Sequence, residues 1–153
     1  NLKKNIPDVI LLIIGSGRSI EINKIKRLVK HNNLQKNVKL LGFRDDVEDI
    51  ISISDIIVNP VKKIESFGLV SIEAMSQKKP IISSKIGAVQ EVIVNNKSGI
   101  LVKPKDPDLL SKKILLLYQN KSLRMSLGKN GFNRYNNMFT IKKMCEKYYK
   151  LLI

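Results

Sequence analysis

The sequence predicts an α/β fold, a Rossmann-like parallel sheet flanked by helices, in one domain that spans residues 1–153. Short apolar runs of strand length alternate with longer segments that have helical periodicity. Several of the apolar runs end at glycine, proline or serine, and 43% of the residues are hydrophobic, which suits a globular protein and excludes a disordered one. Strands joined through helices pair in parallel, so both faces of the sheet are expected to be covered.

The first strand is predicted at residues 8–14, a continuous apolar run that is typical of a strand buried on both faces. A helix follows over residues 19–32, with Ser19 or a neighbour as its cap and an apolar stripe that includes Ile22 and Ile25. A short strand at 38–41, a short helix at 46–54 and a buried strand at 55–59 complete the first part of the chain.

The second part repeats this alternation. Glu73 lies in an apolar helix that runs to about Gln77. The other elements are strands at 80–83 and 99–102 and helices at 88–94, 106–118, 122–136 and 140–152. Phe139, Tyr148 and Tyr149 are expected to pack the last helix. Ligands of parallel sheets bind beyond the carboxyl ends of the strands, which places the candidate site near Gly15, Gly42, Pro60 and Ser84.

The net charge of +15 favours anionic partners. A lysine-rich solvated surface explains this charge most simply, and attraction to an anionic membrane surface is the second interpretation. Nucleic acid is not expected as a partner, because the lysines are dispersed and only 5% of the residues are aromatic. The longest apolar run is too short for a membrane span, and the single Cys145 cannot form an internal disulfide, so a cytoplasmic location is expected.

The most informative motif is the pair Glu65 and Glu73, eight positions apart around Gly68 at a junction from loop to helix. A loop carboxylate and a carboxylate in the first turn of a helix can face one cleft, with the backbone N–H groups of residues 67–70 between them. Carboxylates accept hydrogen bonds from sugar hydroxyls, and a helix N-terminus attracts an anion. This pattern predicts a nucleotide-sugar site, although a helix start decorated with acidic residues has the same spacing.

Other motifs are weaker. Gly15-Ser16-Gly17 forms either a tight turn or a loop that lines a nucleotide pocket, since Ile20 stands where a dinucleotide fingerprint has its third glycine. Asp106-x-Asp108 is expected to cap a helix rather than to bind a metal. No metal-ligand spacing and no Ser-His-Asp set can be assembled, so neither a metal nor another cofactor is expected.

The motifs together resemble the family 4 retaining glycosyltransferases (glycosyl transferases group 1), in which two glutamates flank a Phe-Gly-Leu block. The resemblance runs almost from end to end. It includes residues 11–17, 38–43, 54–60, 65–69, 73–75, 79–82, Gly87-Ala88 with Glu91, and 99–102. It implies the C-terminal, donor-binding half of the two-domain GT-B architecture, and a hexosyltransferase activity in polysaccharide or glycolipid synthesis.

The resemblance also implies roles for individual residues. Glu65 would act at the reaction centre by binding sugar hydroxyls, and Glu73 would hold the ribose. The segment Ser66-Phe67-Gly68-Leu69-Val70 would approach the sugar and the phosphates. The base would lie near Gly42-Phe43-Arg44, and Gly15 and Gly17 would line the nucleotide pocket.

The resemblance has limits. The acceptor-binding N-terminal domain and the start of the donor domain, with its diphosphate-binding Arg and Lys, are expected to be missing, so this piece alone is expected to bind donor weakly and to be inactive. The implied partners are a UDP-, GDP- or ADP-sugar, a glycan or lipid-linked acceptor and, on the inner face of the membrane, anionic lipid. A nucleotide-sugar 2-epimerase of the same fold and a non-catalytic nucleotide-binding module remain the alternatives.

Overall fold

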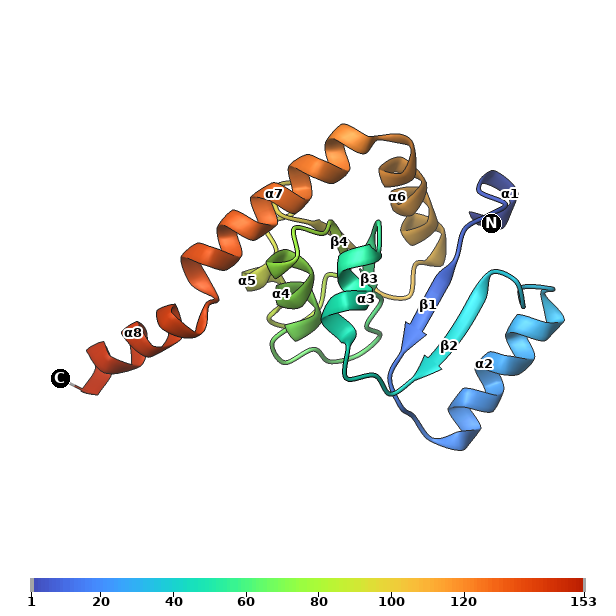
Figure 1. Cartoon of the computed structure of the whole chain (residues 1–153), viewed down its shortest axis with the longest axis horizontal. Coiled ribbons are helices and arrows are strands. Elements are labelled where there is room, and N and C mark those ends of the chain that lie inside the picture. Colours follow the sequence, from blue (N-terminus) through green and yellow to red (C-terminus); the bar gives the residue numbers. More distant parts are fainter. Residues whose placement is uncertain (1, 153) are drawn as a thin grey trace. The chain divides into compact units, whose positions relative to one another are not determined.

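The structure is a computed structural model that describes residues 2–152. The chain divides into two compact units, Asn1–Val47 (unit 1) and Glu48–Ile153 (unit 2) (Figure 1). All strand pairs are parallel, as predicted. They form a two-stranded sheet in unit 1 and a three-stranded sheet in unit 2.

Unit 1 contains α1 (Leu2–Asn5), β1 (Leu11–Ile14), α2 (Ser19–His31) and β2 (Val38–Gly42). Asn37 is buried just before β2, and its side-chain amide donates to the carbonyls of Pro7 and Val9 at 2.9 and 2.8 Å. The carbonyl of Asn37 accepts from the amide of Leu11 at 2.7 Å. This one side chain therefore ties the segment that enters β1 to the start of β2.

One prediction for unit 1 is wrong in detail. β1 is not buried on both faces, because Leu11 is 48% exposed and the other residues of the strand are only half-buried. The N-cap of α2 is Arg18, a neighbour of Ser19, in agreement with the prediction. It makes no side-chain capping bond, because a guanidinium has no acceptor, and it pairs with Glu21 at 2.8 Å instead.

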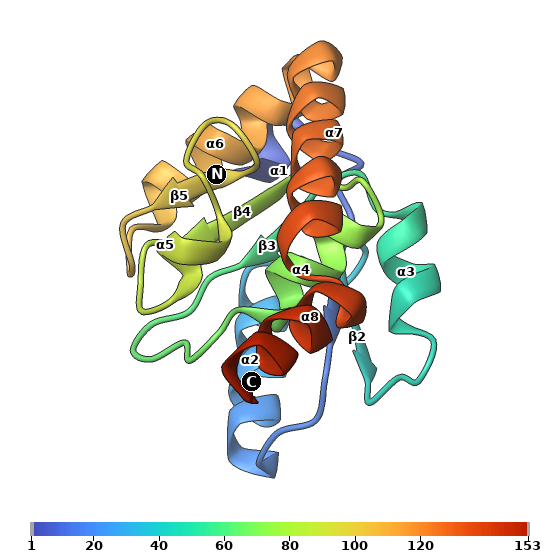
Figure 2. The same cartoon turned by 90° about the vertical axis from the view of Figure 1, so that its left-hand side faces the viewer.

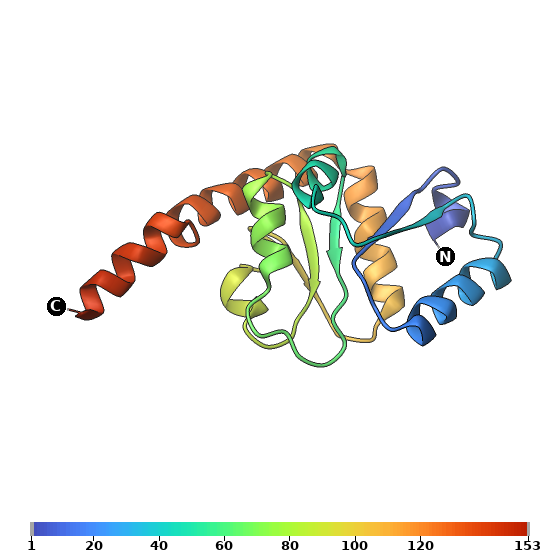
Figure 3. The same ribbon diagram turned by 60° about the horizontal axis from the view of Figure 1, so that its bottom comes forward.

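Unit 2 has a three-layer arrangement around its sheet (Figure 3). The sheet has the order β3-β4-β5, with bounds Ile57–Asn59, Ile81–Ser84 and Ile100–Val102. The helices are α3 (Val47–Ile53), which begins at the last residue of unit 1, α4 (Leu69–Ser76), α5 (Val89–Val92), α6 (Pro107–Gln119), α7 (Lys121–Met138) and α8 (Ile141–Leu152).

The central strand β4 divides the core of unit 2 into two clusters. Because successive side chains of a strand point to opposite faces, Ile81 packs with Met75 of α4 and Val89 of α5, and Ile82 packs with Leu117 of α6 and Leu127 of α7. All four residues of β4 are buried, as expected for a central parallel strand.

α8 differs from the other long helices, since it extends away from the body of unit 2 (Figure 1). None of its described residues is buried. Tyr148 and Tyr149 are 63% and 68% exposed, so the prediction that they pack the helix is wrong. Phe139, at the C-cap of α7, does pack against the core. No helix among residues 2–152 is long and apolar enough to cross a membrane.

α7 lies close against the C-terminal end of α4 (Figure 2). Glycines make this approach possible. A Cβ added to Gly128 would lie 2.0 Å from the carbonyl oxygen of Lys78, and a Cβ on Gly131 would lie 3.1 Å from Cγ of Met75. The first of these contacts involves backbone on both sides, so it has no rotamer through which to relax.

We expect Gly128→Ala to destabilise the protein. Alanine in a helix interior is intrinsically favoured over glycine by about 0.5–1 kcal/mol, but the backbone overlap should outweigh this gain and lower the free energy of unfolding by about 1–3 kcal/mol. Urea denaturation measures the difference. Asn133→Ala, at an exposed position of the same helix, is the control and should stay within about 0.5 kcal/mol of the parent. Equal stabilities for the two variants would contradict the close approach.

Candidate functional site

The loop from β3 to α4 carries most of the predicted site residues. α4 begins at Leu69, and its N-cap is Gly68 in the left-handed region (φ 86°, ψ 45°), which glycine adopts without steric penalty. One carboxylate oxygen of Glu65, Oε1, accepts from the amide of Gly68 at 3.1 Å. The side chain of Glu65 therefore turns back toward the start of the helix that follows it.

The second carboxylate oxygen of Glu65 connects the loop to the sheet. The side-chain amide of Asn59, the last residue of β3, donates to Oε2 of Glu65 at 3.4 Å. The carbonyl of Asn59 accepts from the hydroxyl of Ser83 in β4 at 3.2 Å. The carboxylate is thus held at the carboxyl edge of the sheet, where parallel α/β folds bind their ligands.

The opposite side of the loop rests on Gly87. Gly87 has a φ of 52°, and a Cβ there would lie 2.2 Å from the carbonyl oxygen of Glu65. No side chain fits between these two backbone segments. The segment that leads from β4 to α5 therefore supports the Glu65 loop directly.

The first turn of α4 presents free donors. The amides of Ser71 and Ile72 donate to the carbonyl of Gly68 at 2.9 and 3.3 Å. Among residues 2–152, the amides of Leu69 and Val70 have no acceptor, and these residues are 62% and 38% exposed. Free amides at a helix start attract negative charge, and the helix dipole adds to this attraction.

Glu73 is exposed on α4. It is the fifth residue of the helix, which confirms the prediction that Glu73 lies about one turn into it, and it therefore lies just after the first turn rather than within it. The helix ends at Ser76 with Gln77 as its C-cap, as predicted. The convergence of the carboxylates of Glu65 and Glu73 on one ligand stays a prediction.

A buried hydroxyl lies under the loop. Ser71 is fully buried in the first turn of α4, and its Oγ has no hydrogen-bond partner among the described residues. It lies 3.7 Å from the position that a Cβ on Gly68 would occupy. Such a group is unfavourable, since an unsatisfied buried hydroxyl costs about 1–3 kcal/mol.

In unit 1, two of the predicted nucleotide-binding glycines meet. The amide of Gly15, after β1, donates to the carbonyl of Gly42, at the end of β2, at 2.8 Å. A Cβ on either glycine would have no heavy atom within 4 Å, so the space beside both is open. Gly17 is also exposed, and Phe43 is 79% exposed. The structure leaves the tight turn and the nucleotide-lining loop as the two interpretations of Gly15-Ser16-Gly17.

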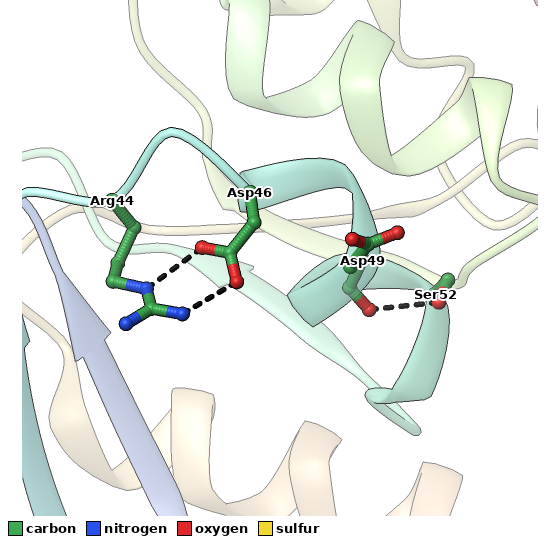
Figure 4. Close-up of polar contacts among 4 residues, drawn as sticks. All are labelled: Arg44, Asp46, Asp49 and Ser52. Carbon is green, nitrogen blue, oxygen red and sulfur yellow. Dashed lines mark hydrogen bonds and ion pairs between the residues drawn. The ribbon is translucent and has the colours of Figure 1, made fainter.

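Arg44 is paired within its own loop (Figure 4). Its Nε donates to Oδ1 of Asp46 at 2.7 Å, and a second guanidinium nitrogen donates to Oδ2. This hydrogen-bonded pair lowers the pKa of Asp46 and raises that of Arg44. In α3, which follows, the hydroxyl of Ser52 bonds back to the carbonyl of Asp49 at 2.7 Å. A guanidinium held in a bidentate pair is already neutralised, so the backbone of residues 42–44 offers the freer donors and acceptors.

Asp106 is the N-cap of α6, as expected, and its Oδ1 accepts from the amide of Leu109 at 2.8 Å. Residues 2–152 contain no group of three or more His, Cys, Asp or Glu side chains that could hold a metal ion. Sequence reasoning missed Asn59 as the partner of Glu65. Its place at the carboxyl end of a predicted strand was the signal that could have indicated this role.

The parallel sheets flanked by helices match the GT-B glycosyltransferase fold. The crystal structure of Anabaena Alr3699/HepE in complex with UDP-glucose superimposes with a TM-score of 0.91 and 22% identity, over 95% of this chain and 41% of that one. The family model of glycosyl transferases group 1 matches residues 1–134. The chain therefore belongs to the glycosyl transferases group 1 family.

Two curated relatives each share about a third of their aligned residues with this chain. "Uncharacterized glycosyltransferase MJ1178" of Methanocaldococcus jannaschii is 33% identical over 133 residues, which cover 86% of this chain and 36% of that protein. The "UDP-Gal:alpha-D-GlcNAc-diphosphoundecaprenol alpha-1,3-galactosyltransferase" of Escherichia coli is 32% identical over 149 residues, which cover 97% of this chain and 38% of that enzyme. The chain thus spans little more than a third of the length of these relatives.

We expect Arg44→Gln to raise the pKa of Asp46 toward the ordinary range of an aspartate, because the substitution removes the hydrogen bond and the charge that lower it. NMR titration of the Asp46 carboxyl carbon measures this shift. With the pKa lowered in the folded state, the pair stabilises the fold above the pKa of the unfolded chain, and this contribution is lost as the pH falls through the folded pKa.

Lys39→Gln is the matched control for this titration, since it removes one exposed positive charge from unit 1 and leaves the Arg44–Asp46 pair intact. An Asp46 pKa that is the same in the parent and in Arg44→Gln would contradict the pairing. If the pKa of Asp46 rises equally in Arg44→Gln and Lys39→Gln, the net positive charge of the region lowers it, and not a specific pair with Arg44.

Proposed function

We propose that this chain is the donor-binding part of a retaining glycosyltransferase, which transfers a sugar from a nucleotide-sugar to a glycan or lipid acceptor in cell-surface polysaccharide or glycolipid synthesis. The observation that carries the proposal is the loop of residues 65–70. There the Glu65 carboxylate is fixed beside two helix-start amides, those of Leu69 and Val70, which have no acceptor within the described part of the chain, residues 2–152.

This arrangement suits the chemistry of a nucleotide-sugar. The amides of Leu69 and Val70 would bind the diphosphate and stabilise the negative charge that grows on it as the glycosidic bond breaks. The Glu65 carboxylate retains lone pairs that can accept from sugar hydroxyls while Gly68 and Asn59 orient it. Exposed Glu73 would accept from the ribose hydroxyls. We assign the glutamates to donor positioning, with front-face attack by the acceptor and no metal ion.

Base recognition would fall to unit 1. Because Asp46 occupies the guanidinium of Arg44, we assign the base to the backbone groups of Gly42, Phe43 and Arg44. Backbone N–H and C=O groups are uncharged, and they can recognise a base by its shape and by the hydrogen bonds of its edge. Gly15 and Gly17 would line the same nucleotide pocket.

A UDP-sugar is the donor that the comparisons favour. The name of the E. coli relative specifies UDP-Gal and a diphosphoundecaprenol-linked acceptor. Anabaena HepE, which shares the fold, was crystallised with UDP-glucose. GDP- and ADP-sugars remain candidates in the test below.

The proposal is tested by calorimetric titration of the protein that carries this chain with UDP-, GDP- and ADP-glucose. One donor should bind in preference to the others. Glu73→Ala should weaken its binding about tenfold or more, since a hydrogen bond to a charged group contributes about 1.5–3 kcal/mol. Glu73 is exposed, so its loss should leave stability unchanged. Glu65→Gln should weaken binding as well, but it also disturbs the loop through Gly68.

Glu48→Gln, an exposed carboxylate on α3, is the control and should bind the donor as the parent does. Parent protein that binds none of the three donors would contradict the proposal. Product that forms without any acceptor would favour the 2-epimerase. Tight binding of DNA or RNA with a steep salt dependence and no nucleotide preference would favour the non-catalytic module.

We further propose a cytoplasmic location with peripheral attachment to an anionic membrane through α8. With 100° per residue, the apolar side chains of α8 gather on one face, namely Ile141, Met144, Cys145, Tyr148, Tyr149, Leu151 and Leu152. The opposite face holds Lys142, Lys143, Glu146, Lys147 and Lys150. An exposed helix with an apolar face and a basic face suits the interface of an anionic bilayer, where each lysine contributes about 1 kcal/mol.

Vesicle sedimentation tests this attachment. The combined Lys142→Gln, Lys147→Gln and Lys150→Gln variant should bind phosphatidylglycerol vesicles at least about tenfold more weakly than the parent. The control removes three exposed lysines from α2 by Lys24→Gln, Lys26→Gln and Lys30→Gln, and it should bind more tightly than the α8 variant. Equal binding by the two variants would contradict a role for α8.

A further inference from the structure

The Glu65–Val70 loop (the donor loop) has a support that comes from far along the chain. The ring of Phe67 meets the ring of Phe139 edge to face, with centroids 6.4 Å apart and planes at 79°. Phe139 is the C-cap of α7 and packs against the core cluster that contains Met75 and Val89. The half-exposed side chain of Phe67 is therefore held by the ring of Phe139, which itself packs against the core.

Arg134 contacts both Phe139 and the C-terminal end of α5. Its guanidinium carbon lies 5.6 Å from the centroid of the Phe139 ring, within the range of a cation–π contact. Its Nε and one terminal nitrogen donate to the carbonyls of Val92 and Glu91 at 2.7 and 2.6 Å. These carbonyls belong to the last turn of α5, which has no later turn to satisfy them.

The two supports of the donor loop thus share one side chain. On one flank, Gly87 leads into α5 and contacts the backbone of Glu65. On the other flank, Phe139 contacts Phe67. Arg134 binds the end of α5 and lies over Phe139, so a single residue of α7 fixes the spacing of the two flanks.

We propose that Arg134 and Phe139 are positioning residues for the donor loop. Neither is placed against the substrate. They hold Phe67 and Glu65 where the free amides of Leu69 and Val70 face the donor, and this consequence for donor binding rests on the function proposed above. Loss of the Phe139 ring frees Phe67 and loosens the loop while the sheet and the helices remain intact.

α7 also offers a control residue, Phe132, whose ring likewise has an aromatic neighbour and a cation over its face. Phe132 is half-buried on the same helix, its ring lies 6.4 Å from that of Tyr135, and Nζ of Lys78 lies 4.6 Å over its face. Phe139→Leu and Phe132→Leu each remove one aromatic ring with a cation over it. Only the first of these rings contacts the donor loop.

The experiment uses the protein that carries this chain and has two readouts besides stability in urea. Amide hydrogen exchange at Gly68 reports the order of the ligand-free loop, since this amide donates to Glu65. Calorimetry with UDP-glucose, or with whichever donor the parent prefers, reports donor affinity. Phe139→Leu should exchange Gly68 at least about threefold faster than the parent and bind donor about three- to tenfold more weakly. Phe132→Leu should lower stability and change neither readout.

Phe139→Tyr keeps the ring and should restore both readouts. The inference is overturned if Gly68 exchanges equally fast in Phe139→Leu and Phe132→Leu, or if loop exchange rises in Phe139→Leu while donor affinity stays at the parental value. A parent that binds no nucleotide-sugar contradicts the proposed function, and in that case faster exchange of Gly68 in Phe139→Leu alone still supports the positioning role of Phe139.

Discussion

Strand β4 supplies four consecutive buried residues at the centre of unit 2. The helices that pack on both sides of the sheet are needed to cover these residues. Since Ile81 and Ile82 must both be covered, each face of the sheet needs its own layer of helices. The same strand ends at Ser84, near the hydroxyl of Ser83 that bonds to Asn59. The burial that stabilises the fold therefore also fixes the edge of the sheet at which the loop of Glu65 begins.

Sequence periodicity was sufficient for most of this architecture. The strands around Ile57, Ile82 and Leu101 and the helices that follow them were predicted, with boundaries that differ by a few residues, because alternating strands and helices leave few parallel topologies. Exposure was less predictable. The apolar run of β1 and the tyrosines of α8 have the composition of core elements, yet β1 is at most half-buried and the tyrosines are exposed. Residue composition shows which segments can be buried. Tertiary packing decides which of them are buried in the folded protein.

For the site, the sequence could place residues 65–70 at a helix start, because the loop residues and the apolar run of α4 define that junction. It could not show that Glu65 turns back onto the amide of Gly68, since this depends on the left-handed cap and on Asn59 from another element. The contacts of Phe67 with Phe139, and of Arg134 with α5, join residues more than forty positions apart. No local pattern in the sequence encodes such pairs.

The buried hydroxyl of Ser71, which finds no hydrogen-bond partner among residues 2–152, is unfavourable for the first turn of α4. It places an unfavourable polar atom at the base of α4, directly under the glycine that begins the helix. The first turn is therefore less stable than an all-apolar interior would make it. Under the proposed function, this turn lies beside the loop that binds and releases the charged donor, where a smaller free energy of local opening is an advantage.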